Sequence, residues 1–338
     1  MDLEIYKEKY KFLLNIHHNK FYDKSVLLIG SGRMAEAYCH SLRSYGISKV
    51  VLLGNRKEKV EIVARQFGFK GLDGGYEKHL DLLGDFSLII IALPIELLFN
   101  AGVKLLQKGY KNILIEKPGA LYPKELLFLA KMAEQNKARV RIAYNRVVYP
   151  SLWKAKELVE FDGGITSCVY SFTEWTHRVK LSDYSDQVKR RWGLANPLHV
   201  ISMVHYLIGY PKDISCFQKG YLEWHTAGDR FFGSGLSEKD IPFSYYADWN
   251  SAGRWGVKFM TSSQAIKLIP LEDLYSCKKG SIQWEKIEII PAFPNLKTGV
   301  AEEVAIMLDH KMEEYFPLID LEEGSHLLSL GEKIFGYN

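Results

Sequence analysis

Short, almost continuously apolar runs alternate with segments of helical periodicity from residue 25 to residue 144. Because strands of this kind are buried on both faces, the alternation predicts a parallel sheet with helices on its two sides. The expected strands cover 25–29, 50–53, 86–93, 112–115 and 140–144, and the expected helices cover 33–45, 57–67, 96–108 and 123–136. The sequence therefore predicts a doubly wound α/β domain over residues 25–146.

The pattern changes after Pro150, where most strand-like stretches follow one another without helices between them. Strands in direct succession indicate an open, largely antiparallel sheet, so we expect a second domain of α+β type over residues 147–338. Its expected strands cover 165–175, 214–224, 243–249, 255–261, 265–269 and 281–290, and its expected helices cover 152–159, 197–208, 300–310 and 321–335. Residues 1–24 have apolar positions at helical spacing and are expected to form an amphipathic helical extension.

Composition narrows the class of protein. With 47% hydrophobic and 25% charged residues over 338 positions, disorder is excluded and two domains are expected. The net charge of +4 is too small and too evenly mixed for a dedicated nucleic-acid or membrane-surface protein. No apolar run approaches the length of a membrane span, and the N-terminus lacks the pattern of a signal peptide. We therefore expect a soluble cytoplasmic protein whose partner is a small molecule, not a nucleic acid or a membrane.

The four cysteines Cys39, Cys168, Cys216 and Cys277 are far apart and form no C-x-x-C pair. Their spacing matches neither a zinc site nor a disulfide framework. We expect free thiols in a reducing compartment and no bound metal.

A glycine-rich motif follows the first expected strand and opens the first expected helix. It reads Gly30-Ser31-Gly32-Arg33-Met34-Ala35, which is G-x-G-x-x-A. The first glycine permits a tight turn, the second lets the backbone approach a pyrophosphate, and the small alanine allows the helix to pack closely on the strand. The anion would lie at the helix N-terminus. The sequence thus predicts dinucleotide binding; the alternative is a glycine turn that serves only to fold the chain.

The second expected strand ends in Asn55-Arg56-Lys57, where an acid would hold the ribose 2′-hydroxyl of NAD. No acid is present. Asn55 can bond to a ribose oxygen, and Arg56 and Lys57 can bind a 2′-phosphate by charge-assisted hydrogen bonds. This favours NADP(H), with NAD(H) as the other cofactor and a solvated basic turn as the alternative interpretation.

The fourth expected strand ends in Glu116-Lys117-Pro118, and Asn145-Arg146-x-x-Tyr149-Pro150 follows the fifth. Together with the glycine motif, this order resembles the Gfo/Idh/MocA family of oxidoreductases over roughly residues 25–215. The resemblance implies a Rossmann domain in which Glu116, Lys117 and Pro118 lie at the cofactor, with Lys117 reaching the reacting carbon and hydroxyl. An ammonium there would stabilise negative charge on a carbinol oxygen. The alternative is a surface lysine at a strand end.

The turn at Leu93-Pro94 corresponds to a T-P-N-x-x-H-like turn that the family places beside the cofactor. Pro94 keeps the turn, whereas Ile95 and Leu98 replace polar residues. The resemblance implies that Leu93 and Pro94 contact the cofactor through a less polar surface than is usual in the family.

The resemblance also implies an acid/base histidine on a helix of the second domain. His199 stands in the matching register, ten residues before Gly209. The family aspartate four residues before this histidine is Ala195, so either Asn196 substitutes for it or the hydroxyl chemistry differs. His199 would exchange the proton of the reacting group; the alternative is a structural histidine. His205 lies on another helix face, so the two histidines do not form a zinc-ligand pair.

Aromatic and cationic residues gather before this helix and suit the binding of sugar rings and phosphates. Expected substrate contacts are Asn145, Arg146, Trp175, Arg191, Trp192 and Asn196. For Asn145 and Arg146 the alternative is an interdomain hydrogen-bond pair. One face of the second sheet would be free to pair with another subunit, as in the family, so we expect a homodimer or homotetramer.

The combined interpretation is an NADP(H)-dependent oxidoreductase that transfers hydride to or from a carbinol carbon of a sugar-like or sugar-nucleotide molecule, in biosynthetic reduction. Lys117 would polarise the reacting oxygen and His199 would exchange its proton. Two alternatives stay open. Ala195 is compatible with a reductase of an imine or conjugated double bond, and loss of the family's polar residues is compatible with a non-catalytic NADP-binding regulator or scaffold.

Overall fold

The computed structural model describes residues 20–82 and 84–337 of the chain, and these divide into two units. The first unit contains the described residues up to Asn145 together with Ala292–Ser325. The second contains Arg146–Pro291 and the described residues from His326 onward. The extension expected over 1–24 falls largely outside the described residues. In the described part of the chain, no helix is both long enough and apolar enough to cross a membrane.

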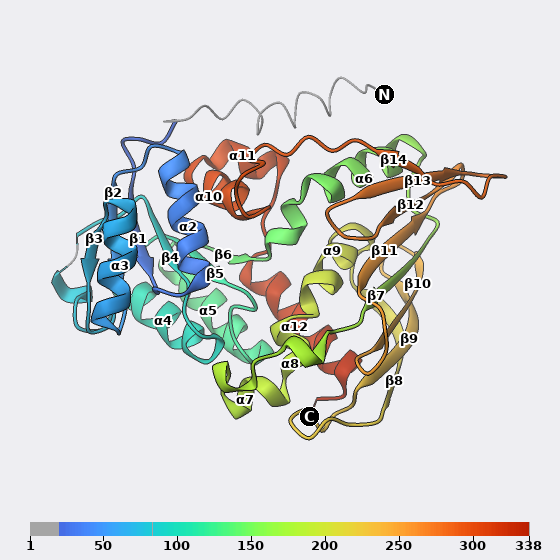
Figure 1. The fold of residues 1–338 in the computed structure, drawn as a ribbon, viewed down its shortest axis with the longest axis horizontal. Coiled ribbons are helices and arrows are strands. Elements are labelled where there is room, and N and C mark those ends of the chain that lie inside the picture. Colours follow the sequence, from blue (N-terminus) through green and yellow to red (C-terminus); the bar gives the residue numbers. More distant parts are fainter. Residues whose placement is uncertain (1–19, 83, 338) are drawn as a thin grey trace. The chain divides into compact units, whose positions relative to one another are not determined.

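A six-stranded parallel sheet forms the centre of the first unit, in the order β3-β2-β1-β4-β5-β6 (Figure 1). The strands are β1 (Ser25–Ile29), β2 (Lys49–Leu53), β3 (Lys70–Leu72), β4 (Leu88–Ile91), β5 (Asn112–Glu116) and β6 (Arg139–Ala143). β1 pairs with β2 on one side and with β4 on the other, so after β3 the chain crosses back to the other side of β1 and the strand order reverses between β1 and β4. Ligands of doubly wound sheets bind at such a switch point, outside the carboxyl ends of the strands.

The helices of this sheet match the sequence expectation closely. They are α2 (Arg33–Ser44), α3 (Lys57–Phe67), α4 (Ile95–Gln107), α5 (Pro123–Gln135) and the single turn η1 (Leu80–Leu82). The central strands β1 and β4 are fully buried along their apolar residues, as continuous hydrophobic runs require. The doubly wound prediction is therefore confirmed.

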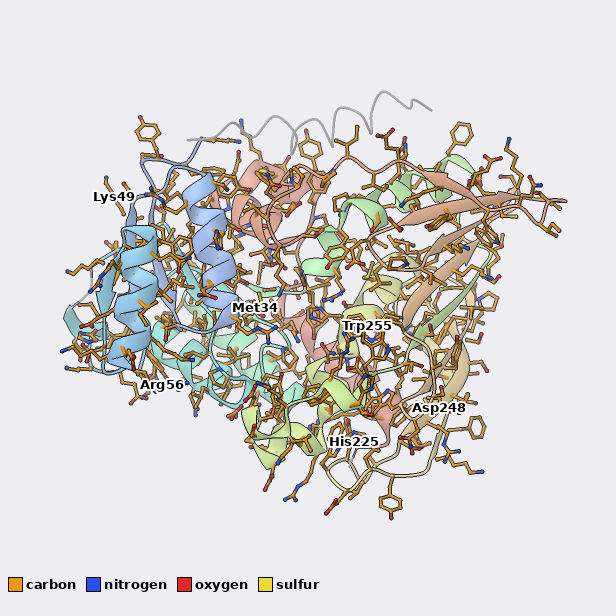
Figure 2. The ribbon with its side chains drawn as sticks, viewed as in Figure 1. Met34, Lys49, Arg56, His225, Asp248 and Trp255 are labelled. Carbon is orange, nitrogen blue, oxygen red and sulfur yellow. The ribbon has the colours of Figure 1, made fainter. Side chains whose placement is uncertain are left out.

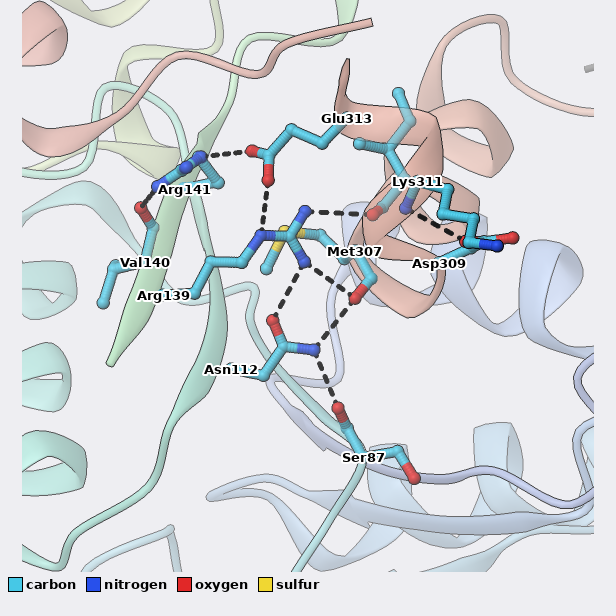
Figure 3. Close-up of polar contacts among 10 residues, drawn as sticks. Ser87, Asn112, Arg139, Val140, Arg141, Met307, Asp309, Lys311 and Glu313 are labelled. Carbon is cyan, nitrogen blue, oxygen red and sulfur yellow. Dashed lines mark hydrogen bonds and ion pairs between the residues drawn. The ribbon is translucent and has the colours of Figure 1, made fainter. Parts of the chain in front are cut away.

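Residues 292–325 pack in the first unit, whereas the sequence analysis assigned them to a domain over 147–338. They form α10 (Val300–Leu308), α11 (His310–Tyr315) and the start of α12 (Leu321–Phe335), and α10 packs on α2. Arg139 of β6 explains the attachment, because its guanidinium donates to the Ile306 and Met307 carbonyls, each at 3.0 Å (Figure 3). It thereby caps the C-terminal end of α10, where carbonyls lack helical partners.

Further polar contacts hold the same segment, as Figure 3 shows. Arg139 Nε donates to Glu313 of α11 at 2.7 Å, and Asn112 Nδ2 donates to the Met307 carbonyl at 2.9 Å. These contacts join residues nearly two hundred positions apart (|i−j| = 195 for Asn112 and Met307), which no local pattern signals.

An eight-stranded sheet dominates the second unit, in the order β14-β13-β12-β11-β7-β10-β9-β8, with only β7 and β10 paired in parallel. Its strands are β7 (Ser167–Phe172), β8 (Pro211–Lys219), β9 (Arg230–Ser237), β10 (Pro242–Asp248), β11 (Trp255–Met260), β12 (Gln264–Leu268), β13 (Leu274–Lys278) and β14 (Glu285–Ile287). Its helices are α6 (Pro150–Phe161), α7 (Asp186–Arg190), α8 (Trp192–Ala195) and α9 (Leu198–Ile208), with the turns η3 (Thr176–Arg178) and η4 (Leu181–Asp183); η2 (Asn145–Val148) begins at the division. The predicted open, largely antiparallel sheet is confirmed.

Three strands, β3, β9 and β13, were not expected from the sequence. β9 contains Gly233 and Gly235, which read as turn residues in a sequence. In the structure a Cβ on Gly233 would lie 2.3 Å from the Tyr245 hydroxyl oxygen and 2.5 Å from the Ser215 carbonyl oxygen. The glycine is therefore a packing requirement of a strand interior.

Candidate functional site

The glycine motif lies at the switch point of the first sheet. Gly30 follows β1, and its N–H donates to the Leu53 carbonyl at the end of β2 at 2.7 Å. Its φ of +129° is a conformation that favours glycine. A Cβ at this position would lie 2.1 Å from the Ala92 carbonyl oxygen, just after β4. Gly30 thus lets the turn fit between the ends of β2 and β4.

Gly32 is the N-cap of α2 and leaves the start of that helix open. No side chain caps the helix N-terminus, and a Cβ built on Gly32 would meet no atom within 4 Å. The Ala35 side chain is fully buried in the first unit. Uncapped first-turn N–H groups facing open space are suited to an anion. The residues present therefore fit the pyrophosphate of a dinucleotide.

The residues expected at the ribose follow β2 and are exposed. The two neighbouring turns approach each other closely, because a Cβ on Gly54 would lie 2.7 Å from Ser31 Oγ. Lys57 pairs at 3.9 Å with Glu61 across a turn of α3, whereas Arg56 makes no ion pair with any residue that the structure describes. Arg56 therefore offers an uncommitted guanidinium at this end of β2 (Figure 2).

Lys117 lies at the carboxyl end of β5, next to a buried carboxylate. Glu116 is 6% exposed and accepts a hydrogen bond from the Tyr38 hydroxyl of α2 at 2.8 Å. Burial raises the pKa of Glu116, and the neighbouring charge of Lys117 opposes that rise. Pro118 follows through a cis peptide bond and is buried, while Lys117 is half-buried. The Tyr38 bond anchors the strand end from which Lys117 extends.

Leu93 and Pro94 lie between β4 and α4, at the same edge of the sheet as the glycine motif. Pro94 is exposed and is the N-cap of α4. Leu93 is half-buried.

In the second unit, His199 belongs to a cluster built around Glu174, which the sequence analysis did not select. Glu174 follows β7, is 3% exposed, and accepts hydrogen bonds from Trp255 Nε1 at 2.8 Å and from Asn196 Nδ2 at 2.7 Å. Burial raises the pKa of Glu174, and the bond from Asn196 opposes the rise. The ring of His199 lies 6.1 Å from that of Trp255, and the His199 N–H donates to the Asn196 carbonyl at 3.1 Å. We call Glu174, Asn196, His199 and Trp255 the Glu174 cluster.

Cationic side chains stack on Trp255, a member of this cluster, and on Trp175. The Arg254 guanidinium carbon lies 4.2 Å from the ring centre of Trp255 and 4.7 Å from that of Trp175, and the Arg146 guanidinium carbon lies 4.7 Å from the ring centre of Trp255. Such distances are within the range of cation–π attraction. Nε of Arg146 is buried and finds no hydrogen-bond acceptor among the described residues. A buried donor of this kind is available to a polar ligand.

Arg191 and Trp192, both expected at the substrate, have structural contacts. Arg191 is 7% exposed, pairs with Glu332 and lies over the ring of Tyr337. Trp192 is buried edge-on against Tyr184. Both residues thus stabilise the second unit around its C-terminal helix and tail.

Asn145 also has a structural contact, in the first unit. Its Nδ2 donates to the Thr298 carbonyl at 2.8 Å. It thereby holds the chain that leads into α10, and the unit division separates it from Arg146.

His205 shares α9 with His199 and is buried. Its Nε2 lies 3.2 Å from the Tyr170 hydroxyl and its Nδ1 lies 2.8 Å from the Gly209 carbonyl. Burial lowers the pKa of His205 to about 4. Over residues 20–82 and 84–337, no three His, Cys, Asp or Glu side chains are grouped to hold a metal ion.

The described structure therefore brings the expected site residues together in two groups. The glycine motif, the turn after β2, the turn after β4 and Lys117 share the carboxyl edge of the first sheet. In the second unit, Asn196 contacts Glu174, Arg146 and His199 contact Trp255, and Trp175 contacts Arg254, which also stacks on Trp255. Glu174 lies inside the strand that the sequence predicted over 165–175, so nothing marked it as a site residue. Its hydrogen-bond partners Asn196 and Trp255 lie too far along the chain to be anticipated.

Residues 24–144 match the model of a family described as "Oxidoreductase family, NAD-binding Rossmann fold", the Gfo/Idh/MocA family. The matched residues contain the whole six-stranded sheet and its glycine motif. The predicted family resemblance and the NAD-binding α/β fold are confirmed.

Solved structures share the fold over most of the chain. A levoglucosan dehydrogenase in complex with NADH and L-sorbose is 17% identical with a TM-score of 0.77, over 92% of this chain and 95% of that one. A UDP-N-acetylglucosamine 3-dehydrogenase from Acidithiobacillus ferrooxidans is 14% identical with a TM-score of 0.71, over 92% and 96%. Identities this low establish the likeness of the fold alone.

Curated relatives match only a short stretch. A glutamyl-tRNA reductase from Saccharolobus islandicus is 32% identical over 79 residues, and one from Carboxydothermus hydrogenoformans is 35% identical over 68 residues. The alignments cover 23% and 20% of this chain and only 17% and 15% of those proteins. The chain thus spans about a sixth of the length of these relatives.

Proposed function

We propose that this protein, whose residues 24–144 match the NAD-binding Rossmann fold of the Gfo/Idh/MocA oxidoreductase family, transfers hydride between a nicotinamide and a carbinol carbon of a sugar-like substrate. The observation that carries the proposal is the carboxyl edge of the first sheet. An open, uncapped helix N-terminus and the half-buried Lys117 share that edge. The bound nicotinamide would supply the hydride chemistry.

Lys117 has the chemistry to act on the reacting oxygen. Its ammonium would donate a hydrogen bond to the carbonyl oxygen of an oxidised substrate and stabilise the negative charge that develops there during reduction. Glu116, held by Tyr38, fixes the backbone that carries this lysine. His199 would exchange the proton of the hydroxyl group. Asn196 and Trp255 would orient the start of α9, which carries His199.

The stacked arginines and tryptophans support a sugar-like or sugar-nucleotide substrate. The half-buried Trp175, with Arg254 over its ring, presents an aromatic and cationic surface, and the buried Nε of Arg146 offers a donor for a hydroxyl or phosphate oxygen. Two proteins of the same fold act on such molecules by name, levoglucosan and UDP-N-acetylglucosamine. We infer that the substrate carries several hydroxyl groups and that the reaction runs toward reduction in biosynthesis.

A substrate screen tests the reaction class. Oxidised sugars and sugar nucleotides are offered with NADPH and with NADH, and loss of the reduced nicotinamide is followed at its absorbance band. Turnover of at least one keto-sugar supports the proposal. Cofactor binding without turnover of any sugar, together with turnover of cyclic imines or conjugated carbonyl compounds, would instead support the alternative reductase that Ala195 permits; binding with no turnover at all would support a regulator.

We propose NADP(H) as the preferred cofactor because Arg56 and Lys57 follow β2 where an acid would select NAD. Replacing Arg56→Asp should weaken NADPH by about tenfold to a hundredfold relative to NADH, since a charge-assisted bond to the 2′-phosphate is lost and a like charge is introduced. Fluorescence titration of both cofactors measures the ratio. Lys59→Asp, an equal charge change at an exposed position of α3, is the control. An unchanged NADPH/NADH ratio in Arg56→Asp contradicts the ribose assignment.

A homodimer or homotetramer through the second sheet is proposed from its exposed aromatic face. Phe217, Phe232 and Tyr246 stand directly opposite one another on β8, β9 and β10, with 67%, 44% and 50% of their surface exposed. Neighbours in register lie on one face of a sheet. We call these three residues the aromatic ladder. A second copy could bury the ladder against itself about a two-fold axis.

Replacing Phe232→Lys at the centre of the aromatic ladder should raise the dimer dissociation constant by at least about thirtyfold, because a central aromatic anchor contributes about 2 kcal/mol or more. Sedimentation over a concentration series measures it. Phe161→Lys changes a more exposed aromatic, 69% against 44% for Phe232, at the end of α6 and should leave the assembly intact. A wild-type monomer, or an unaffected Phe232→Lys oligomer, rules out this interface.

A further inference from the structure

The chain between β14 and α10 returns to the first unit and brings Lys297 to the glycine motif. Lys297 Nζ lies 2.8 Å from Sδ of Met34. Met34 is in the first turn of α2, immediately after the N-cap Gly32 and Arg33. A lysine that is distant from this motif in sequence (|i−j| = 263 from Met34) therefore lies beside the uncapped N-terminus of α2.

The position of Lys297 is built into the unit. The neighbouring Thr298 carbonyl accepts a hydrogen bond from Asn145, and Gly299 passes so near the Asn145 backbone that a Cβ would lie 2.2 Å from its carbonyl oxygen. On the other side of Lys297, the ring of Phe293 packs edge-on against Tyr45 of the first unit at 5.4 Å. Both flanks of Lys297 are thus attached to the body of the unit, so its backbone is held at the motif.

The charge of Lys297 reaches two buried carboxylates as well as the helix end. Burial raises the pKa of Glu116 and of Glu303, and in both groups the positive charge of Lys297 opposes the rise. Glu116 immediately precedes Lys117. Lys297 therefore adds positive potential between the glycine motif and the end of β5, which is the path a bound dinucleotide must follow across the switch point.

We propose that Lys297 is a cofactor-binding residue that donates to the pyrophosphate of the dinucleotide. A thioether is a weak hydrogen-bond acceptor, whereas phosphate oxygens are strong, charged acceptors for an ammonium. Lys297 is exposed, and no atom lies within 4 Å of a Cβ built on Gly32 in the preceding turn of the motif. The inference rests on the dinucleotide site alone and is independent of the substrate.

Titration of NADH fluorescence with the full-length protein tests the proposal. Lys297→Ala should raise the Kd for NADH by about tenfold, and Lys297→Arg, which keeps the charge, should stay within about threefold of the wild type. The slope of log Kd against log salt concentration should become shallower in Lys297→Ala, because one cation–phosphate contact is lost. Lys49→Ala removes the same charge from the opposite end of β2 and should change nothing (Figure 2).

ADP-ribose locates the contact on the ligand, since it keeps the pyrophosphate and lacks the nicotinamide. Competition titrations should show it weakened by Lys297→Ala as much as NADH is. An unchanged Kd for NADH, or a loss confined to NADH with ADP-ribose unaffected, overturns the proposal. A loss accompanied by a lower melting temperature is resolved by Lys297→Met, which keeps the packing of the stem: full affinity in that variant also overturns it. Failure of the wild type to bind NADH would instead contradict the dinucleotide site itself.

Discussion

Replacing Lys117→Ala should lower kcat about a thousandfold with the sugar substrate that the screen identifies. In the proposed reaction the Lys117 ammonium would stabilise the charge developing on the reacting oxygen, and loss of such a group costs typically about 10²–10⁴-fold in rate. Glu116 and Tyr38 stay in place in this variant, so the cofactor edge of the sheet is retained. The Kd for NADPH, measured by fluorescence, should therefore change by no more than about threefold.

Two variants separate this role from a general effect of charge. Lys117→Arg keeps the cation but moves the donor atoms, so it should recover less than about a tenth of the lost rate. Lys124→Ala removes an exposed lysine at the start of α5 in the same unit and should keep full activity. A kcat within tenfold of the wild type in Lys117→Ala, or a loss explained entirely by weaker NADPH binding, would remove Lys117 from the chemistry.

The sequence predicted the parts of the molecule that depend on local patterns. The strands of the first sheet are continuous apolar runs, and the turn at Gly30 to Ala35 carries its chemistry within six consecutive positions. The anchoring of Glu116 by Tyr38 was not foreseen, because the two residues are 78 positions apart. Burial on both faces of a parallel sheet leaves so strong a pattern that these elements follow from hydrophobicity alone.

Contacts between residues far apart in the sequence could not be predicted from hydrophobic patterns or local motifs. Nothing in residues 292–325 indicates that Arg139 would cap α10, and so the segment was assigned to the wrong unit. Lys297 was overlooked for the same reason. Its neighbours in sequence read as a turn-rich connection, and only the fold brings it to Met34.

The Glu174 cluster changes how the missing family aspartate is understood. Ala195 supplies no carboxylate before His199. Glu174 instead accepts a hydrogen bond from the side chain of Asn196, and the backbone carbonyl of Asn196 accepts one from the backbone N–H of His199. A carboxylate from the end of β7 thus reaches the start of α9 by way of an amide. Asn196 and Glu174 together thus form a polar support at the start of α9.

Replacing Gly30→Ala should lower the free energy of unfolding by about 4 kcal/mol, the sum of backbone strain at a positive φ and steric overlap in a packed site. The Cβ would lie 2.1 Å from the Ala92 carbonyl oxygen, and because that atom belongs to the backbone after β4, a side-chain rotation cannot relieve the overlap. Denaturant unfolding of the wild type and the variant measures the loss. Wild-type stability in the Gly30→Ala variant would mean that the turn between β1 and α2 has another geometry.

Gly32→Ala is the matched variant, and it should keep the stability of the wild type but bind NADH more weakly. Its φ of −93° and ψ of −174° are open to alanine, and its Cβ meets no atom within 4 Å, so stability should change by less than about 0.5 kcal/mol. The same methyl group fills the space through which a pyrophosphate approaches the α2 amides, and NADH should bind about tenfold to a hundredfold more weakly. One methyl therefore acts on folding at Gly30 and on binding at Gly32. Normal NADH affinity in Gly32→Ala would show that the dinucleotide does not lie over this helix end.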